Sequence, residues 1–229
     1  MNQINWIIAI VEHSRGNHAA SLFEKSACSV LAITQGRGTA SSAIMDCLGL
    51  DQPEKELVIG IGTRQSSRLL LKKLGGEMEF KKPGKGIAFL IPLSGISKTA
   101  AGYLPSVTFS DTISHTDNKE DPSMNTFPDY ELIASLIDEE ISSLVVDAAK
   151  AAGCQGGTLI KARDFDQSSR KFLGISLARE KEILLILIPK KKRKAVLNSI
   201  CETVMKETGE QASLFAIPIE AAEGITMEL

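Results

Sequence analysis

Lys181-Glu182-Ile183-Leu184-Leu185-Ile186-Leu187-Ile188-Pro189 is the most apolar predicted strand of the chain, and its beginning is matched by Lys55-Glu56-Leu57-Val58-Ile59. The two stretches lie 126 positions apart, the difference between 55 and 181. The same offset aligns residues 7–92 with residues 133–218 without a gap. A solenoid needs several stacked repeats, so this single internal duplication predicts two similar domains instead.

The bulk composition is that of an ordinary globular protein. The chain has 229 residues, a formal net charge of -2, and 43% hydrophobic residues, which suits two domains of about 100 residues each. A pI near 6.0 gives no general basic field, so we expect no nucleic-acid partner. Aromatic residues make up only 5%, which argues against a platform for stacking bases.

The cysteines and the N-terminus suggest a reduced, intracellular protein. None of the four cysteines, Cys28, Cys47, Cys154 and Cys201, belongs to a CxxC pair, so no metal site is predicted. Cys28 and Cys154 stand at equivalent points of the repeat and are interpreted as buried small hydrophobic residues. The first residues lack the basic start and apolar core of a signal peptide, and no run of about 20 apolar residues occurs. We therefore expect a cytoplasmic protein without a membrane span.

Apolar periodicity predicts the same order of elements in both halves. In the first half, Gly16 and Asn17 are expected to break the chain before a helix, and Gly75-Gly76 to end the second helix. The elements predicted there are the strand Ile4–Val11, the helix Ala19–Ala27, the strands Val30–Thr34 and Leu57–Ile61, the helix Arg64–Leu74 and the strand Ile87–Ile91. Those predicted in the second half are the strand Leu132–Ile137, the helix Leu144–Ala152, the strands Thr158–Ala162 and Ile183–Ile188, a helix from Pro189 to Met205 and the strand Leu214–Ile217.

Each half therefore has the order βαββαβ, which is the split βαβ of ferredoxin-like folds. The predicted class is α+β, with two tandem ferredoxin-like domains and antiparallel sheets. We assign residues 1–97 to copy one, 98–126 to a polar linker and 127–229 to copy two, with residues 103–109 of the linker as a candidate extra edge strand. Because helices cover only one face of such a sheet, apolar strands predict domain pairing or a homo-oligomer.

Two glycine stretches in copy one are candidate anion sites. Gly36-Arg37-Gly38-Thr39 follows a predicted strand, and Pro83-Gly84-Lys85-Gly86 precedes one. Small residues let backbone N–H groups face an anion, while Arg37 and Lys85 add charge. The alternative is that both stretches are simple tight turns. Neither stretch is a Walker motif, because the chain has no GxxxxGK[ST] sequence.

Five segments of the chain form a further pattern. In copy two they are residues 151–163, from Ala151-Ala152-Gly153-Cys154 to Arg163, and residues 172–175 and 181–189. In copy one they are Gly36-Arg37-Gly38-Thr39 and residues 83–93. Together these segments resemble the PII nitrogen-regulatory signalling family. The resemblance covers both copies almost from end to end.

The resemblance implies a cytoplasmic regulatory protein that is not an enzyme. Proteins of this family form trimers, bind ATP or ADP in clefts between subunits, and touch partner proteins through a loop between the second and third strands. By position, Gly36 and Arg37 would lie at the base of that loop, followed by Gly38 and Thr39. Gly84, Lys85 and Gly86 would face the phosphates of ATP, ADP or AMP, or another small anionic metabolite, and Arg64 would begin the second helix nearby.

Copy two departs from this pattern. Its stretch matching the phosphate-facing glycines is Gly209-Glu210-Gln211-Ala212-Ser213, in which Glu210 would repel a phosphate. The short loop from Thr39 to Glu54 has no tyrosine, so the family's uridylylation site has no counterpart. The basic run Lys190–Lys194 and the acidic pair Glu139-Glu140 are interpreted as solvated surface, with a phosphate or nucleic-acid patch as the alternative for the basic run.

Two other functions remain open. One is a structural or interaction protein whose ligand site has decayed, which the copy-two sequence favours. The other is an acylphosphatase-like enzyme, which would need an anion-holding loop with a placed arginine and asparagine. Gly36-Arg37-Gly38 follows the second strand rather than the first, and no asparagine has an evident partnering position.

Overall fold

The computed structural model describes residues 3–39, 53–97, 102–104, 130–163, 171–172, 175–176 and 180–225. Copy one begins with β1 (Ile4–Glu12), α1 (Gly16–Glu24) and β2 (Ser29–Gly38), and continues with β3 (Glu54–Thr63), α3 (Arg64–Glu77) and β4 (Gly86–Leu93). The order is the predicted βαββαβ.

Copy two repeats these elements at the offset of the sequence repeat. Its elements are β5 (Tyr130–Asp138), the 3-10 turn η1 (Glu139–Ile141), α5 (Ser142–Ala151), β6 (Thr158–Arg163), β9 (Glu180–Pro189), the 3-10 turn η2 (Lys190–Lys192), α6 (Arg193–Thr208) and β10 (Ser213–Pro218). Both bounds of β9 lie 126 positions after those of β3, and both bounds of β5 lie 126 positions after those of β1. Two short strands, β7 (Lys171–Phe172) and β8 (Ile175–Ser176), pair with each other, and β11 (Ala221–Glu223) follows β10.

The strand order confirms the predicted fold class. The nine strands of the larger sheet have the order β10-β5-β9-β6-β2-β3-β1-β4-β11. Within each copy the last strand therefore neighbours the first, and the third lies between the first and the second, which is the ferredoxin-like arrangement. The pairings described for this sheet, such as β1 with β4 and β5 with β9, are antiparallel.

The chain forms two compact units, each discontinuous in sequence. The first contains residues 1–33, 57–128 and 219–229, and the second contains residues 34–56 and 129–218. The second unit thus includes the last residues of β2, 34–38, and the first residues of β3, 54–56, and the first unit includes β11. The domain limits expected from the sequence, at 97 and 126, stay a prediction.

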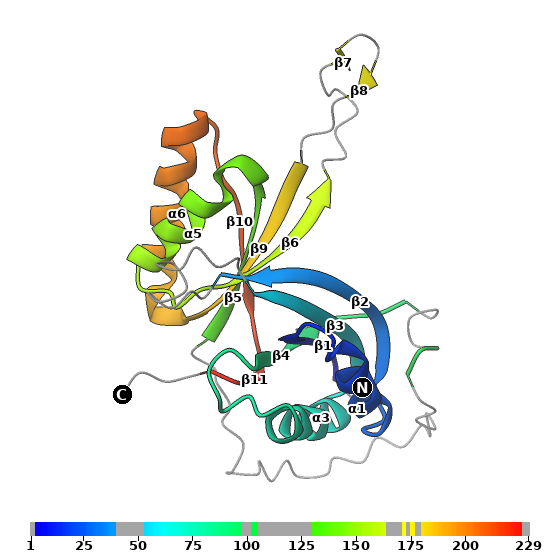
Figure 1. The fold of residues 1–229 in the computed structure, drawn as a ribbon. Helices are drawn as coiled ribbons and strands as arrows, with labels where there is room; N and C mark the ends of the chain where they lie inside the picture. The colour runs from blue at the N-terminus through cyan, green and yellow to red at the C-terminus, as the bar shows by residue number, and fades with distance from the viewer. Residues whose placement is uncertain are drawn as a thin grey trace. The chain divides into compact units, whose positions relative to one another are not determined.

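In the first unit, α1 and α3 cover one face of the sheet (Figure 1). Every second residue of β1 points at these helices, and the buried side chains include Ile7 of β1, Leu22 and Phe23 of α1, and Leu70 and Leu74 of α3. Burying each such side chain contributes about 1.5–3 kcal/mol. The alternation along β1 and the helical spacing in α3 are the periods on which the sequence prediction rested.

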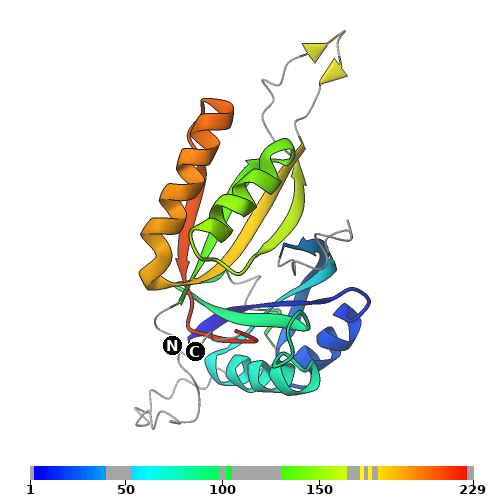
Figure 2. The ribbon, with the colours of Figure 1, turned by 60° about the vertical axis from the view of Figure 1, so that its left-hand side comes forward.

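In the second unit, α5 and α6 lie side by side over one face of the sheet (Figure 2). Ser199 of α6 donates a hydrogen bond from Oγ to the carbonyl oxygen of Ala148 in α5, at 2.8 Å. The core beneath the helices contains Ile133 and Ile137 of β5, Leu184, Ile186 and Ile188 of β9, Val145, Val146 and Ala149 of α5, and Val196, Ile200 and Val204 of α6.

Some glycine and proline positions were predicted incorrectly. Gly16 and Asn17 do not break the chain but begin α1, and Gly75 and Gly76 lie within α3 rather than ending it. Pro189 is the last residue of β9 and precedes η2, rather than occupying the first helical turn. Glycine suits position 75 of the helix because a Cβ there would lie only 3.2 Å from the side chain of Glu223.

Other predictions fall wholly or partly outside the described residues. These are the loop from Thr39 to Glu54 with Cys47, most of the linker, and residues 105–109 of the candidate edge strand. Within the described residues, no helix combines the length and the apolar character needed to cross a membrane.

Candidate functional site

The turn between α3 and β4, residues 82–86, has the backbone geometry that its glycines suggested. Gly84 has a φ of +77° and Gly86 a φ of +149°, angles that side chains disfavour. A Cβ at Gly86 would lie 2.5 Å from the carbonyl oxygen of Ile10, whereas nothing lies within 4 Å of a Cβ at Gly84. Gly86 therefore lets the chain enter the β1–β4 ladder opposite Val11, and Gly84 leaves open space at the turn.

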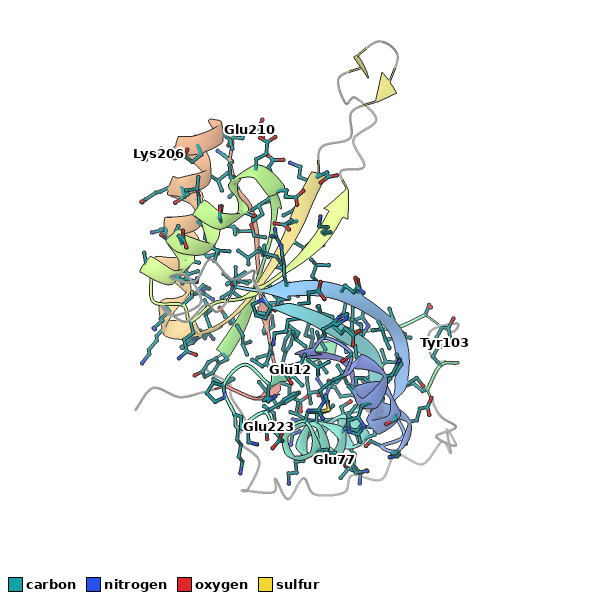
Figure 3. The ribbon with its side chains drawn as sticks, in the orientation of Figure 1. Glu12, Glu77, Tyr103, Lys206, Glu210 and Glu223 are labelled. Carbon is teal, nitrogen blue, oxygen red and sulfur yellow. The ribbon has the colours of Figure 1, made fainter. Side chains whose placement is uncertain are left out.

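Lys85 of this turn pairs with a carboxylate on the neighbouring strand. Its Nζ lies 3.1 and 3.0 Å from the two carboxylate oxygens of Glu12 at the end of β1, and Figure 3 marks Glu12. Both side chains keep about a third of their exposure, 33% for Lys85 and 35% for Glu12. Such an exposed pair contributes about 0–1 kcal/mol, because water screens it and both side chains lose freedom.

Further cations surround the same turn. Lys82 pairs with Glu79, and this hydrogen bond, together with the charge of Lys82, lowers the pKa of Glu79. Lys85 and Arg15 are close enough to lower this pKa further. Lys81 precedes Lys82 and is exposed. The turn therefore gathers more positive than negative charge around two glycines of positive φ, a combination that suits an anion.

Arg64 begins α3, as predicted, but its partner belongs to the C-terminal segment of the chain. Its Nε donates to Oε1 of Glu220 at 2.7 Å, and Nε of Arg68, one helical turn later, donates to the same oxygen at 2.8 Å. Nδ2 of Asn5 in β1 donates to the other oxygen, Oε2, at 3.0 Å. Three donors from two elements of the first unit thus hold one carboxylate.

Gly36, Arg37 and Gly38 form the end of a strand and not a loop, which corrects the sequence interpretation. β2 continues through Gly38 because Arg37 and Gly38 pair with Leu159 and Thr158 of β6. This ladder supplies the backbone hydrogen bonds that a loop would have lacked. The prediction failed because these partners lie about 120 positions away in the sequence, beyond the reach of a local glycine signal.

The side chain of Arg37 is engaged within the second unit. Its Nη2 donates to Oε1 of Glu182 at 2.6 Å, and the side chain of Glu182 has no exposed surface. A buried carboxylate needs such a partner, because an unpaired charge in the interior is costly. Arg37 thus neutralises a charge in the interior of the second unit.

Thr39 connects β2 to the start of β6. Its backbone N–H donates to the carbonyl oxygen of Gly157 at 2.9 Å, and its Oγ1 accepts from the N–H of Gly157 at 2.6 Å. The predicted residues therefore divide between the units. Gly36, Arg37, Gly38 and Thr39 belong to the second unit, and Arg64, Gly84, Lys85 and Gly86 belong to the first.

The second unit contains a cavity of about 240 Å³ lined by both signs of charge, formed by Glu139, Lys161, Ala162, Glu180 and Lys181. A hydrogen bond with Glu180 lowers the pKa of Glu139, and the same hydrogen bond raises the pKa of Glu180. Glu180 is consequently the member of the pair that is protonated first as the pH falls. The sequence offered only the Glu139-Glu140 pair, which was interpreted as a solvated turn.

Sequence reasoning missed three residues of the Glu220 cluster. Arg68 lies four positions after Arg64, a spacing that places two side chains on one helix face, so this signal was present in the sequence. Asn5 and Glu220 gave no such signal, because they lie 215 positions apart. Within the described residues, no group of three or more His, Cys, Asp or Glu side chains is placed to hold a metal ion.

No family model matches the chain, and no curated protein matches it either. Among solved structures, the chain is similar to Arabidopsis thaliana PII bound to citrate, with 21% identity over 40% of this chain and 76% of that one, at a TM-score of 0.33. It is also similar to a Bacillus cereus protein related to NIF3, with 12% identity over 42% of this chain and 27% of that one, at a TM-score of 0.33. An unknown protein from Galdieria sulphuraria shares 12% identity over 95% of this chain and 98% of that one, at a TM-score of 0.30. Likenesses this distant carry no argument about function, and the PII resemblance of the sequence stays a prediction.

Proposed function

We propose that this chain is a PII-like regulatory protein that binds a small anionic ligand at the glycine turn of copy one and acts on a partner protein by binding. Catalysis is not part of the proposal, and the cytoplasm is the proposed location. The observation that carries it is the turn at residues 82–86. Gly84 and Gly86 have positive φ there, nothing lies within 4 Å of a Cβ at Gly84, and Arg15, Lys81, Lys82 and Lys85 outnumber Glu12, Glu79 and Glu223.

The ion pair between Lys85 and Glu12 can be replaced by contacts between Lys85 and a ligand. Glu12 and Lys85 are both partly exposed, so their pairing is weak. A phosphate brings up to two negative charges and several acceptor oxygens, and charge-assisted hydrogen bonds to such a group are stronger than those in a surface ion pair. A phosphate group therefore competes with Glu12 for Lys85 at modest cost. An adenine nucleotide, ATP, ADP or AMP, is the ligand class that the sequence resemblance favours.

We expect one such site per chain, because copy two lacks the features of the copy-one turn. At the offset of the repeat, Glu210 and Ala212 stand where copy one has Gly84 and Gly86, and neither has a positive φ. Glu210 is exposed and acidic (Figure 3), and Gln211 replaces Lys85. The copy-two turn therefore lacks both the backbone shape and the lysine. We expect copy two to contribute structure, and copy one to bind the ligand.

Isothermal titration calorimetry with ATP, ADP and AMP tests this function. We expect saturable heat with the wild-type chain, and binding at least about tenfold weaker in Lys85→Met, because one charge-assisted contact is worth about 1.5–3 kcal/mol. Lys206→Met is the matched control, since Lys206 is exposed on α6 and lies on the other unit. Absence of heat at millimolar nucleotide would exclude the nucleotide ligand, and equal binding by Lys85→Met would exclude this turn. Heat with pyrophosphate alone would assign the site to another small anion.

A further inference from the structure

The last strand of copy one carries an added strand on its outer edge. β11 pairs antiparallel with β4, and its first residue, Ala221, lies opposite Leu90. The N–H of Glu220, just before β11, donates to the carbonyl oxygen of Leu90 at 2.8 Å. Leu90 and Ala221 are both buried and belong to the hydrophobic core of the first unit. An added segment thus closes this edge of the sheet, where backbone groups would otherwise stay unpaired.

Two cations of the adjoining helix anchor this added segment. Arg64 and Arg68, one turn apart on α3, both donate to Oε1 of Glu220, at 2.7 and 2.8 Å. The side chain of Glu220 is only 9% exposed, so this ion pair is internal to the first unit. Copy one therefore holds the segment in two ways, by backbone pairing along β4 and by an acidic side chain on two cations of α3.

Copy two has the same strand edge, but no strand within the described residues pairs with it. β10 is the outermost strand, next to β5 (Figure 1). In copy one Leu90 lies opposite Ile7. In copy two Ala216 lies opposite Ile133, and both are 126 positions further along the chain. Because the register is the same, Ala216 directs its N–H and carbonyl groups away from β5, as Leu90 directs its own away from β1.

The exposure of side chains shows that the edge of β10 is open. Ala216 is exposed, whereas Leu90, its counterpart in copy one, is completely buried. On α6, which runs along β10 (Figure 2), Cys201 is exposed. Cys201 stands at the position of Gly75, which in copy one faces Glu223 of the added segment. β10 contains no charged residue, so it lacks the charges that commonly prevent strand addition at an edge.

The anchoring cations are also present in copy two. Lys190 and Lys194 occupy the positions that match Arg64 and Arg68, at the same offset of 126. Both lysines are exposed, and neither has an ion-pair partner among the residues that the structure describes. Neither η2 nor the first turn of α6 contains an acidic residue. The two lysines are therefore available to an acidic side chain that comes from outside the chain.

One matching position differs in charge. Glu131 stands where copy one has Asn5, but Nη1 of Arg193 donates to both of its carboxylate oxygens, at 3.0 and 3.3 Å, and neutralises it. An acidic side chain at this edge thus meets the two exposed lysines alone. Exposed ion pairs contribute little and are screened by salt, so we expect reversible, salt-sensitive binding.

We propose that the outer edge of β10, together with Lys190 and Lys194, binds an extended segment of a partner protein in which an acidic residue precedes small apolar residues. The segment adds to β10 as a further strand, a common mode of peptide recognition, and its acidic side chain pairs with the two lysines. Glu220 and β11 show in copy one the kind of segment that fits. The surface lies wholly in the second unit and does not depend on ligand binding at the glycine turn.

Residue-resolved hydrogen exchange with a synthetic peptide tests this surface. The probe is the capped peptide Ile-Glu-Ala-Ala-Glu-Gly, the sequence of residues 219–224. At millimolar concentration it should slow amide exchange at Leu214 and Ala216 of the wild-type chain at least about twofold, because a bound strand protects outward N–H groups in proportion to occupancy. The same peptide with glutamine in place of its first glutamate should protect these amides less.

The double variant Lys190→Met/Lys194→Met should lose this protection. Lys191→Met/Lys206→Met is the matched control, because it removes the same charge from exposed positions that do not match Arg64 and Arg68, and it should keep the protection.

Three results would overturn the proposal. The first is unchanged exchange at Leu214 and Ala216 with the peptide, and the second is equal protection by the glutamine peptide. The third is slow exchange at these amides before any peptide is added that becomes fast on dilution, which would mean that a second copy of the chain covers the edge. The experiment contains no nucleotide and leaves Lys85 unaltered, so its failure is distinct from failure of the proposed function.

Discussion

Burial of Glu223 lowers the free energy of unfolding by an amount that depends on pH. It lies beside α3 (Figure 3), where burial raises the pKa of its carboxyl group, and the charges of Lys81 and Lys72 offset part of this effect. A carboxyl group whose pKa is higher in the folded state favours folding while it is protonated. That contribution is complete below its unfolded pKa of about 4.3 and is lost as the pH rises through the higher folded value.

We therefore expect Glu223→Gln to be more stable than the wild-type chain at pH 7, with the difference shrinking as the pH falls to about 4. Urea unfolding of both chains across this range measures it. Glu24→Gln is the control, because Glu24 is an exposed residue of α1. A stability difference independent of pH would contradict the assigned cause.

The glycines show how far single residues can be predicted from sequence. The turn at Gly84 and Gly86 was predicted correctly, because the proline and the lysine beside these glycines mark a turn that local residues form, whereas their role in ligand binding stays a prediction. Gly36 and Gly38 gave the same signal, yet they lie in a strand whose partners come from β6. Local composition distinguishes a turn from an extended strand only when no distant strand supplies hydrogen bonds.

At the scale of elements, α3 illustrates one predicted and one unpredicted boundary. Its start at Arg64 follows a typical capping sequence, in which Oγ1 of Thr63 accepts a hydrogen bond from the N–H of Ser66 at 3.2 Å. Its end at Glu77 lies beyond two glycines that normally stop a helix. The first of these, Gly75, faces Glu223, so a contact with a segment nearly 150 positions away makes glycine suitable there.

The N-terminal cap of α3 is expected to be a measurable contributor to stability. Thr63→Ala removes the acceptor for the Ser66 N–H and should lower the free energy of unfolding by about 1 kcal/mol. Thr63→Ser keeps the hydroxyl and should lose much less. Denaturant unfolding of the three chains compares them. Equal losses in both variants would mean that the methyl group of Thr63, and not its cap, matters.

For the whole molecule, the internal repeat predicted the fold because apolar residues recur at the same strand and helix spacings in both copies. The sequence could not predict that residues 34–56 group with copy two and residues 219–229 with copy one. Nor could it predict Glu220 as the partner of Arg64. Each of these outcomes depends on contacts between segments that are remote in the sequence, while the strands and helices depend on residues two to four positions apart.

In the second unit, one face of the sheet is not covered by helices. This face predicts that the chain forms an oligomer. Phe215 is 60% exposed and Leu136 is 41% exposed, and both lie on the neighbouring strands β10 and β5, where Phe215 pairs with Ala134 and Leu136 pairs with Ser213. Since Ile133 and Ile137 point into the helix-covered core, Ala134 and Leu136 point to the opposite face. Large apolar side chains gathered on an exposed sheet face are typical of a protein interface.

We expect the chain to form a homo-oligomer through this face, and Phe215→Glu to shift it towards the monomer, because the variant places a charge in an apolar interface. Light scattering coupled to size exclusion measures the mass of each species. Met205→Glu is the matched control, since Met205 is 45% exposed on α6, an element on the other face of the sheet. A wild-type mass equal to that of one chain would contradict oligomerisation. An oligomer that is unaffected by Phe215→Glu but dissociated by Met205→Glu would instead place the interface on the helices.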